Sequence, residues 1–247
     1  MIKRYILSVL LSLSLLVACG PKPSPEEVIS RTVDAVSELQ TYRYQMTSAM
    51  ILDGEASQAH MQGEFVSPDR LHVTIVNDDR TEEGIRIGQT EYIWQSYTDS
   101  WEMRDWSAAM YSLRNNMALS TVEMLDSLVG LVKLPDEKID GVSCFHYRGS
   151  IDVEAQVKDR IANLDPTLPG YEEIVQAMAQ QPRSEQNVEF WVGKEDYLLR
   201  QIDTQADMVY TDDEGKDTER EVSISATYSL RFYDFNQPIQ IEHPTGQ

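Results

Sequence analysis

The chain has 247 residues, of which 41 are acidic and 21 are basic, so its formal net charge is −20. A surface this negative repels phosphate backbones and anionic lipid head groups, which excludes nucleic acid as a partner and disfavours flat adsorption to a bilayer. The length is that of one β-rich domain with room for a substantial core.

The first residues have the pattern of a secretory signal peptide. Lys3 and Arg4 precede an apolar run of thirteen residues, Ile6 to Ala18, and this run is too short to cross an apolar layer about 30 Å thick as a helix. The stretch Leu16-Val17-Ala18-Cys19 that ends the run resembles the lipobox of bacterial lipoproteins. The resemblance implies that the chain is cut before Cys19 and that this cysteine carries a diacylglyceryl anchor. An ordinary secretory signal with a chance cysteine is the alternative.

This start divides the chain into three parts. We expect a signal peptide over residues 1–18, a lipidated tether over 19–24 and a single domain over 25–247. The mature protein is then extracytoplasmic and lipid-anchored to the cell membrane, or to an outer membrane if the cell has one. Without Lys3 and Arg4 it keeps 19 basic residues and a formal charge of −22, so attachment depends on the lipid. Cys144 is the other cysteine, and we expect it as a small buried residue.

Several segments have the periodicity of helices. Ser24 is placed to cap a helix from Pro25 to about Leu39, and Glu27 completes a capping box. A second capping box, at Ser120 and Glu123, lies within residues 107–132, which also have helical spacing. Two short helices are expected over residues 153–164 and 171–180. The first helix should pack against the rest of the protein, because five of its apolar residues form one stripe: Val28, Ile29, Val33, Val36 and Leu39.

Elsewhere apolar and polar residues alternate, which is the pattern of half-buried strands. The absence of a βαβ rhythm and the short connections favour antiparallel pairing. A sheet of this size tends to curl, and apolar helices can occupy its concave side. The sequence therefore predicts an α+β fold, with a large curved antiparallel sheet of about ten strands forming an open half-barrel and helices packed in or over its concave face. The strands are expected around residues 42–52, 59–65, 71–75, 85–87, 92–94, 101–103, 145–151, 188–192, 198–210 and 222–235.

This order of elements resembles the LolA/LolB-like superfamily, and its lipid-anchored LppX/LprG type most of all. The resemblance covers nearly the whole mature chain and includes loose phrases such as Phe190-Trp191-Val192 and Tyr233-Asp234-Phe235-Asn236. It implies a half-barrel whose apolar cavity, under a helical lid, holds the acyl chains of lipids or lipoproteins. Some relatives of this kind sense or pass a signal instead. No catalytic residues come with the resemblance.

Candidate ligand-binding residues come from the methionines and from the apolar sides of strands. Met103, Met110, Met117 and Met124 recur every seven residues, and flexible thioethers adapt to varied acyl chains. Filling of an ordinary core is the alternative for these methionines and for the aromatic strand residues. The candidate cavity residues are Tyr44, Met46, Leu71, Val73, Trp94, Met110, Met117, Met124, Phe190, Tyr228 and Leu230.

Motifs for catalysis, metals and cofactors are missing from the sequence. The four histidines stand singly and no His-x-x-x-His spacing occurs, which argues against zinc. The acidic stretch 212–217 lacks the carboxylate spacing of a calcium loop. There is no Gly-x-Ser-x-Gly elbow and no phosphate-binding glycine loop. We therefore expect no metal, no cofactor and no enzyme activity, and a hydrolase is the least favoured class.

Two function classes stay open. The first is a carrier or presenter that binds a lipid or another acylated ligand in the half-barrel cavity and exchanges it by movement of a lid around residues 107–132. The second is a lipid-anchored envelope sensor or interaction domain, in which the interior is filled and a protein partner binds the acidic outer surface. For either class we expect a monomer that contacts the membrane through its Cys19 anchor.

Overall fold

The structure is a computed structural model that describes residues 23–244, apart from 78–79, 98, 106–115, 163, 165, 167–169, 180–183 and 213–219. Within these residues the helices are α2 (Pro25–Ser37), α3 (Met117–Leu125), α4 (Val153–Ala162) and α5 (Tyr171–Ala179). The strands are β1 (Thr41–Leu52), β2 (Glu55–Val66), β3 (Arg70–Asn77), β4 (Arg80–Ile87), β5 (Thr90–Gln95), β6 (Ser100–Asp105), β7 (Leu128–Lys133), β8 (Glu137–Ile139), β9 (Val142–Ile151), β10 (Ser184–Gly193), β11 (Leu199–Asp212) and β12 (Arg220–Tyr233).

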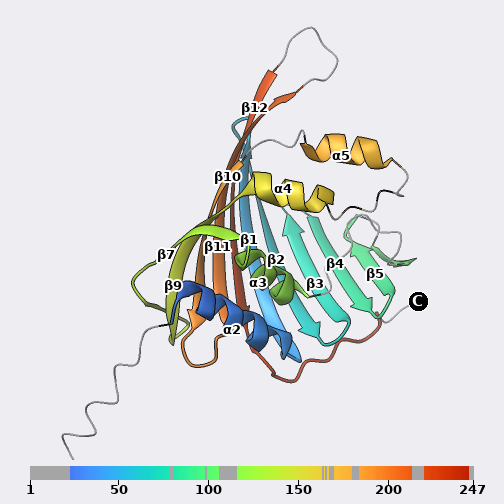
Figure 1. Ribbon diagram of the computed structural model, residues 1–247. Coiled ribbons are helices and arrows are strands. Elements are labelled where there is room, and N and C mark those ends of the chain that lie inside the picture. Colours follow the sequence, from blue (N-terminus) through green and yellow to red (C-terminus); the bar gives the residue numbers. More distant parts are fainter. Residues whose placement is uncertain are drawn as a thin grey trace, which may run out of the picture.

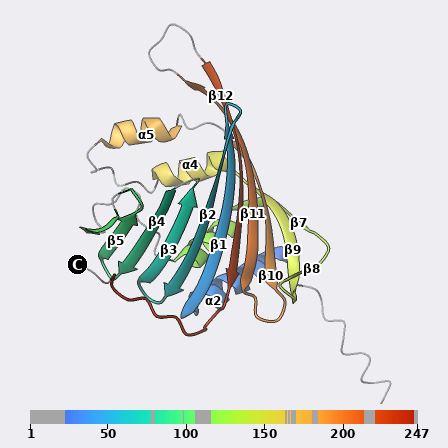
Figure 2. The same cartoon turned by 180° about the vertical axis from the view of Figure 1, so that it is seen from behind.

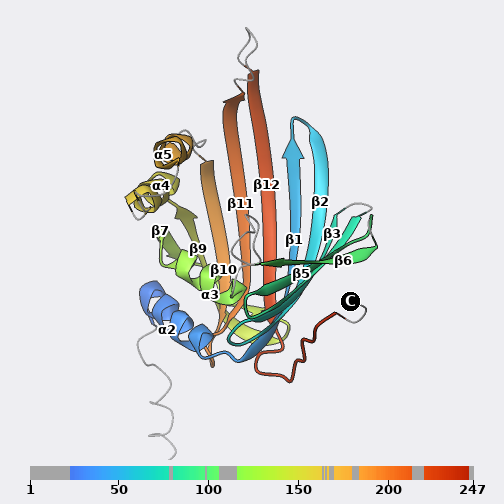
Figure 3. The ribbon, with the colours of Figure 1, turned by 90° about the vertical axis from the view of Figure 1, so that its right-hand side faces the viewer.

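All of these strands belong to one sheet, which is antiparallel at each pairing. Their order is β6-β5-β4-β3-β2-β1-β12-β11-β10-β9-β7, with β8 paired to β9. The first and last strands of the chain, β1 and β12, therefore meet in the middle of the sheet. Figure 1 and Figure 3 show the sheet curving around the helices, which lie on its concave side. In Figure 2, seen from behind, the strands face the viewer.

The main core lies where α2 and α3 pack into the lower part of the concave face. Ser24 caps α2 by accepting a hydrogen bond from the Glu27 N–H at 3.2 Å, while the Glu27 carboxylate pairs with Arg31. Among the described residues, every helix falls short of the length and apolarity that crossing a bilayer requires. The residues that α2 buries against the sheet are Val28, Ile29, Thr32 and Val36.

A second, smaller core holds the C-terminal segment against the outer strands. Ile239 and Ile241 pack with Ile85 and Tyr92 of β4 and β5. Arg70 donates a hydrogen bond to the Ile241 carbonyl at 3.1 Å, and the Tyr92 hydroxyl lies 3.0 Å from His243 Nδ1. We call residues 238–244 the C-terminal strap, because they pack along the lower ends of β3–β5 (Figure 1).

The predicted fold class is confirmed, with two differences in detail. All ten expected strands are present, but the described residues form twelve, because β7 and β8 were not expected. The segment 107–132 is not one helix: α3 ends at Leu125 and the chain continues as strand β7 from Leu128. The helix is capped by Asn116, whose side chain accepts the Leu119 N–H, and not by Ser120. Residues 106–115 lie outside the described residues.

Candidate ligand-binding cavity

The helical wall of the candidate site is α3, which is fixed at its first turn by the core tyrosine Tyr42. The Tyr42 hydroxyl donates to Asn116 Oδ1 at 2.9 Å and accepts a hydrogen bond from the Ala118 N–H at 3.1 Å. Tyr42 is fully buried, and this burial raises the pKa of its hydroxyl well above the usual value. The hydroxyl thus stays protonated and holds the cap of α3 against β1.

The sheet wall of the site is formed by side chains that share the concave face. Register places Met46 opposite Leu230, and Leu230 opposite Ile202. The next row along the strands contains Ser48, Tyr228 and Thr204. Because side chains alternate between the two faces of a strand, these rows point toward α3.

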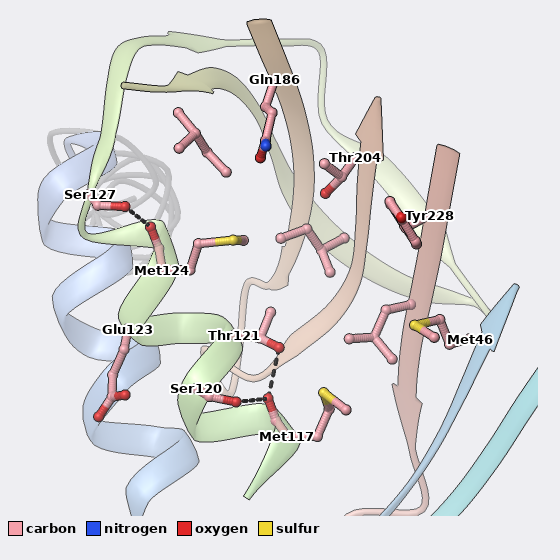
Figure 4. A pocket seen from close by; sticks show the side chains of 13 residues that line it. Met46, Met117, Ser120, Thr121, Glu123, Met124, Ser127, Gln186, Thr204 and Tyr228 are labelled. Atoms are coloured by element: carbon pink, nitrogen blue, oxygen red, sulfur yellow. Dashed lines mark hydrogen bonds between the residues drawn. The ribbon is translucent and has the colours of Figure 1, made fainter. Parts of the chain in front are cut away.

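Between α3 and the sheet lies a cavity of about 680 Å³. This volume lies within the range of about 300–1,000 Å³ that is usual for small-molecule sites. Figure 4 shows Met117 and Met124 on α3, with Gln186, Thr204 and Tyr228 on the strands across from them. The lining residues are Met46, Met117, Ser120, Thr121, Glu123, Met124, Ser127, Ile151, Gln186, Ile202, Thr204, Tyr228 and Leu230.

The lining suits an apolar ligand with a small polar part. Methionine, isoleucine and leucine side chains supply apolar surface, and unbranched thioethers adjust to different chain shapes. Hydroxyl and amide groups also lie in the lining, but three of the hydroxyls are already bonded to the backbone at α3. Ser120 donates to the Asn116 carbonyl at 3.1 Å. Thr121 donates to the Met117 carbonyl at 2.7 Å, and Ser127 donates to the Met124 carbonyl at 2.7 Å. The described residues include no group of three or more His, Cys, Asp or Glu that could hold a metal ion.

The structure separates the predicted cavity residues into two sets. Met46, Met117, Met124, Tyr228 and Leu230 line the cavity together. Four others do not line it and are almost fully buried under the helices or the neighbouring strands: Tyr44, Leu71, Val73 and Phe190. Trp94 is half-buried on β5, opposite Trp101 of β6. Met110 and Cys19 lie outside the described residues.

Sequence reasoning missed the polar part of the lining. Thr204 on β11 and Gln186 on β10 lie on the concave side of the sheet. Each is two residues from a buried apolar residue on the same side, Ile202 and Val188 respectively. A polar residue at a strand position where the alternation predicts an apolar one could have indicated this part of the lining. The sequence predicts a role for Ser120 and Glu123 only as a capping box, and none for Thr121.

The convex face carries charged side chains that pair with one another across strands. His146 stacks on Trp191 with ring centroids 4.3 Å apart, and its Nε2 lies 2.9 Å from Glu189. Burial alone would raise the pKa of Glu189, but hydrogen bonds from Arg148 and His146 lower it below its usual value. Cys144 is fully buried, and burial raises the pKa of its thiol, which disfavours the nucleophilic thiolate. These groups have structural partners and lie away from the cavity.

Comparison with known proteins shows similarity in fold. Neither a protein-family model nor a curated protein matches this sequence. The crystal structure of lipoprotein LppX from Mycobacterium tuberculosis matches with a TM-score of 0.50 and 14% identity, over 89% of this chain and 100% of LppX. LprF from Mycobacterium bovis matches with a TM-score of 0.51 and 14% identity, over 91% of this chain and 99% of LprF. This chain therefore shares the fold of LppX and LprF, as the predicted resemblance to the LppX/LprG type implies.

Proposed function

We propose that this protein is an extracytoplasmic, lipid-anchored carrier that holds a lipid or a lipid-modified molecule in the half-barrel. The cavity of about 680 Å³ between α3 and the sheet is the observation that carries the proposal. At about 25 cal/mol per Å² of apolar surface removed from water, an acyl chain gains several kcal/mol on entering such a site. The protein acts by burying the ligand and releasing it, without a chemical step. A sensor domain with a filled interior is less well supported, because side chains leave this space open.

Filling the cavity from the sheet side is expected to abolish binding. Met46 lies in the cavity wall on β1, and Thr47 is the next residue on the opposite face of the same strand. We expect Met46→Trp to lower the amount of co-purifying lipid at least about fivefold, since the indole occupies the space of the ligand, while the matched control Thr47→Trp keeps it. Lipid is extracted from both purified variants and from the wild-type protein, and its amount per protein is measured by mass spectrometry.

The outcomes of this experiment separate the two function classes. Absence of lipid from the wild-type protein, together with no uptake of a fluorescent acyl probe, contradicts the carrier and favours the sensor. Equal lipid content in Met46→Trp and Thr47→Trp places the ligand elsewhere. Circular dichroism of both variants establishes that the sheet is intact.

The lipid anchor is tested at Cys19. Five residues separate it from the start of α2 at Pro25, so at about 3.3 Å per residue the domain is held within about 20 Å of the membrane. We expect Cys19→Ala to release the protein from the membrane fraction and to abolish labelling by radioactive palmitate. A wild-type protein that takes up no palmitate, or a mature chain that begins at another residue, contradicts the anchor.

A further inference from the structure

The concave face continues beyond the cavity as an apolar surface toward the tips of the central strands. Ile151 and Gln186, which line the cavity, lie opposite each other in register on β9 and β10. The same row continues from Gln186 to Ala206, then to Ala226 and to Met50. The row beyond it contains Met208, Ile224 and Leu52. We call these six residues the upper apolar face: Met50, Leu52, Ala206, Met208, Ile224 and Ala226.

Part of the upper apolar face is open to solvent. Its two alanines, Ala206 and Ala226, are 4% and 1% exposed and lie between the longer side chains of Met50 and of the next row. Met50 and Leu52 are each 38% exposed although they point to the concave side, and Tyr228, where the face meets the cavity, is 40% exposed. Figure 3 shows β11, β12, β1 and β2 projecting past the helices at this end. Within the described part of the chain, Met50 and Leu52 thus remain partly exposed although they lie on the concave face.

We infer that the upper apolar face is an open extension of the binding site, which takes the part of a long acyl chain that exceeds the cavity. This inference rests on the proposed carrier function. The occupant follows from continuity: the first row of the face includes Gln186 and Ile151 of the cavity lining, so a chain lying in the cavity reaches the face across Thr204 and Tyr228, which also line the cavity. From Leu230 to Ile224, six residues of extended strand span about 20 Å. The ligand class is accordingly a lipid with a long, flexible acyl chain.

The two sides of β1 offer a matched test. Met50 and Leu52 point to the upper apolar face, whereas Ile51 between them points to the convex face and is 49% exposed. Aspartate at any of the three adds the same charge to the same strand at an exposed position. Binding is measured with two uncharged probes that differ only in chain length, an eight-carbon monoacylglycerol and an eighteen-carbon monoacylglycerol.

We expect Met50→Asp and Leu52→Asp to weaken binding of the long probe by about tenfold and to leave binding of the short probe within about twofold of the wild type. Ile51→Asp should leave both unchanged. Equal effects of all three variants on the long probe, or no effect of any, overturn the inference while the short probe still supports the carrier. If the wild-type protein binds neither probe, the proposed function and the extension both fail. If only the oligomeric state of Met50→Asp and Leu52→Asp changes, the face is a protein contact and the inference is wrong.

Discussion

Replacing Phe190 with alanine is expected to lower the free energy of unfolding by about 3–5 kcal/mol, the cost of removing a large aromatic side chain from a packed core. Phe190 is fully buried and stacks on Tyr147 with ring centroids 5.3 Å apart. It lies in the row of the sheet that also contains Ile202 and Leu230, but deeper under the helices than the cavity. Denaturation in urea, followed by circular dichroism, measures the change.

A substitution in the cavity wall provides the contrast. Met124→Ala removes a half-buried side chain that already faces open space, so we expect a loss of stability well below that of Phe190→Ala and a clear loss of lipid. If Phe190→Ala left stability within about 0.5 kcal/mol of the wild type, the typical range for surface positions, the residue would be part of the binding surface and not of the core.

Removing the C-terminal strap is expected to have an effect of similar size, confined to one flank of the sheet. A chain that ends at Gln237 loses Ile239 and Ile241 from the second core, and full burial of an isoleucine side chain contributes about 1.5–3 kcal/mol. It also loses the Arg70 bond to the Ile241 carbonyl and the contact of His243 with Tyr92. Because Ile241 is buried and Ile239 only partly so, we expect a loss of about 2–4 kcal/mol.

Hydrogen exchange locates the effect of this truncation. Amide protection should fall in β3, β4 and β5, which the strap contacts, and stay unchanged in β10 and β11 on the far flank. The control is a chain that ends at Pro244, which keeps every strap contact described above. Uniform loss of protection over the whole sheet would show that the strap stabilises the domain globally and not locally.

The alternation of apolar residues predicted the sheet well because most strands have one buried and one solvated face. It failed at β7. Gly130 there has a positive φ of 65°, and the pairing with β9 shifts register between Val129 and Val132. Such a bulge breaks the period of two, so Leu128, Val129 and Val132 acquire the spacing of a helix. The irregularity depends on tertiary pairing, which no local pattern contains.

The candidate site was predictable in part, for a similar reason. The seven-residue spacing of methionines placed Met117 and Met124 together on α3, and strand alternation put Met46, Tyr228 and Leu230 on the concave face. Alternation cannot distinguish a cavity wall from a filled core on the same face. Tyr44 and Met46 are two residues apart and point the same way, yet Tyr44 lies over Gly63 in the packed interior. The position of the helices on the sheet determines which of these residues lie in the core and which line the cavity.

The attachment of α3 at both ends limits how a ligand can leave. Its first turn is bonded to Tyr42, and just beyond its last turn Leu128 pairs with Ile151 of β9. Lifting the helix from the sheet would break these bonds and detach β7. We therefore expect the cavity walls to keep their spacing, in contrast to the predicted movement of a lid around residues 107–132. A bound chain should then leave lengthwise along the sheet, with slower release for each added methylene.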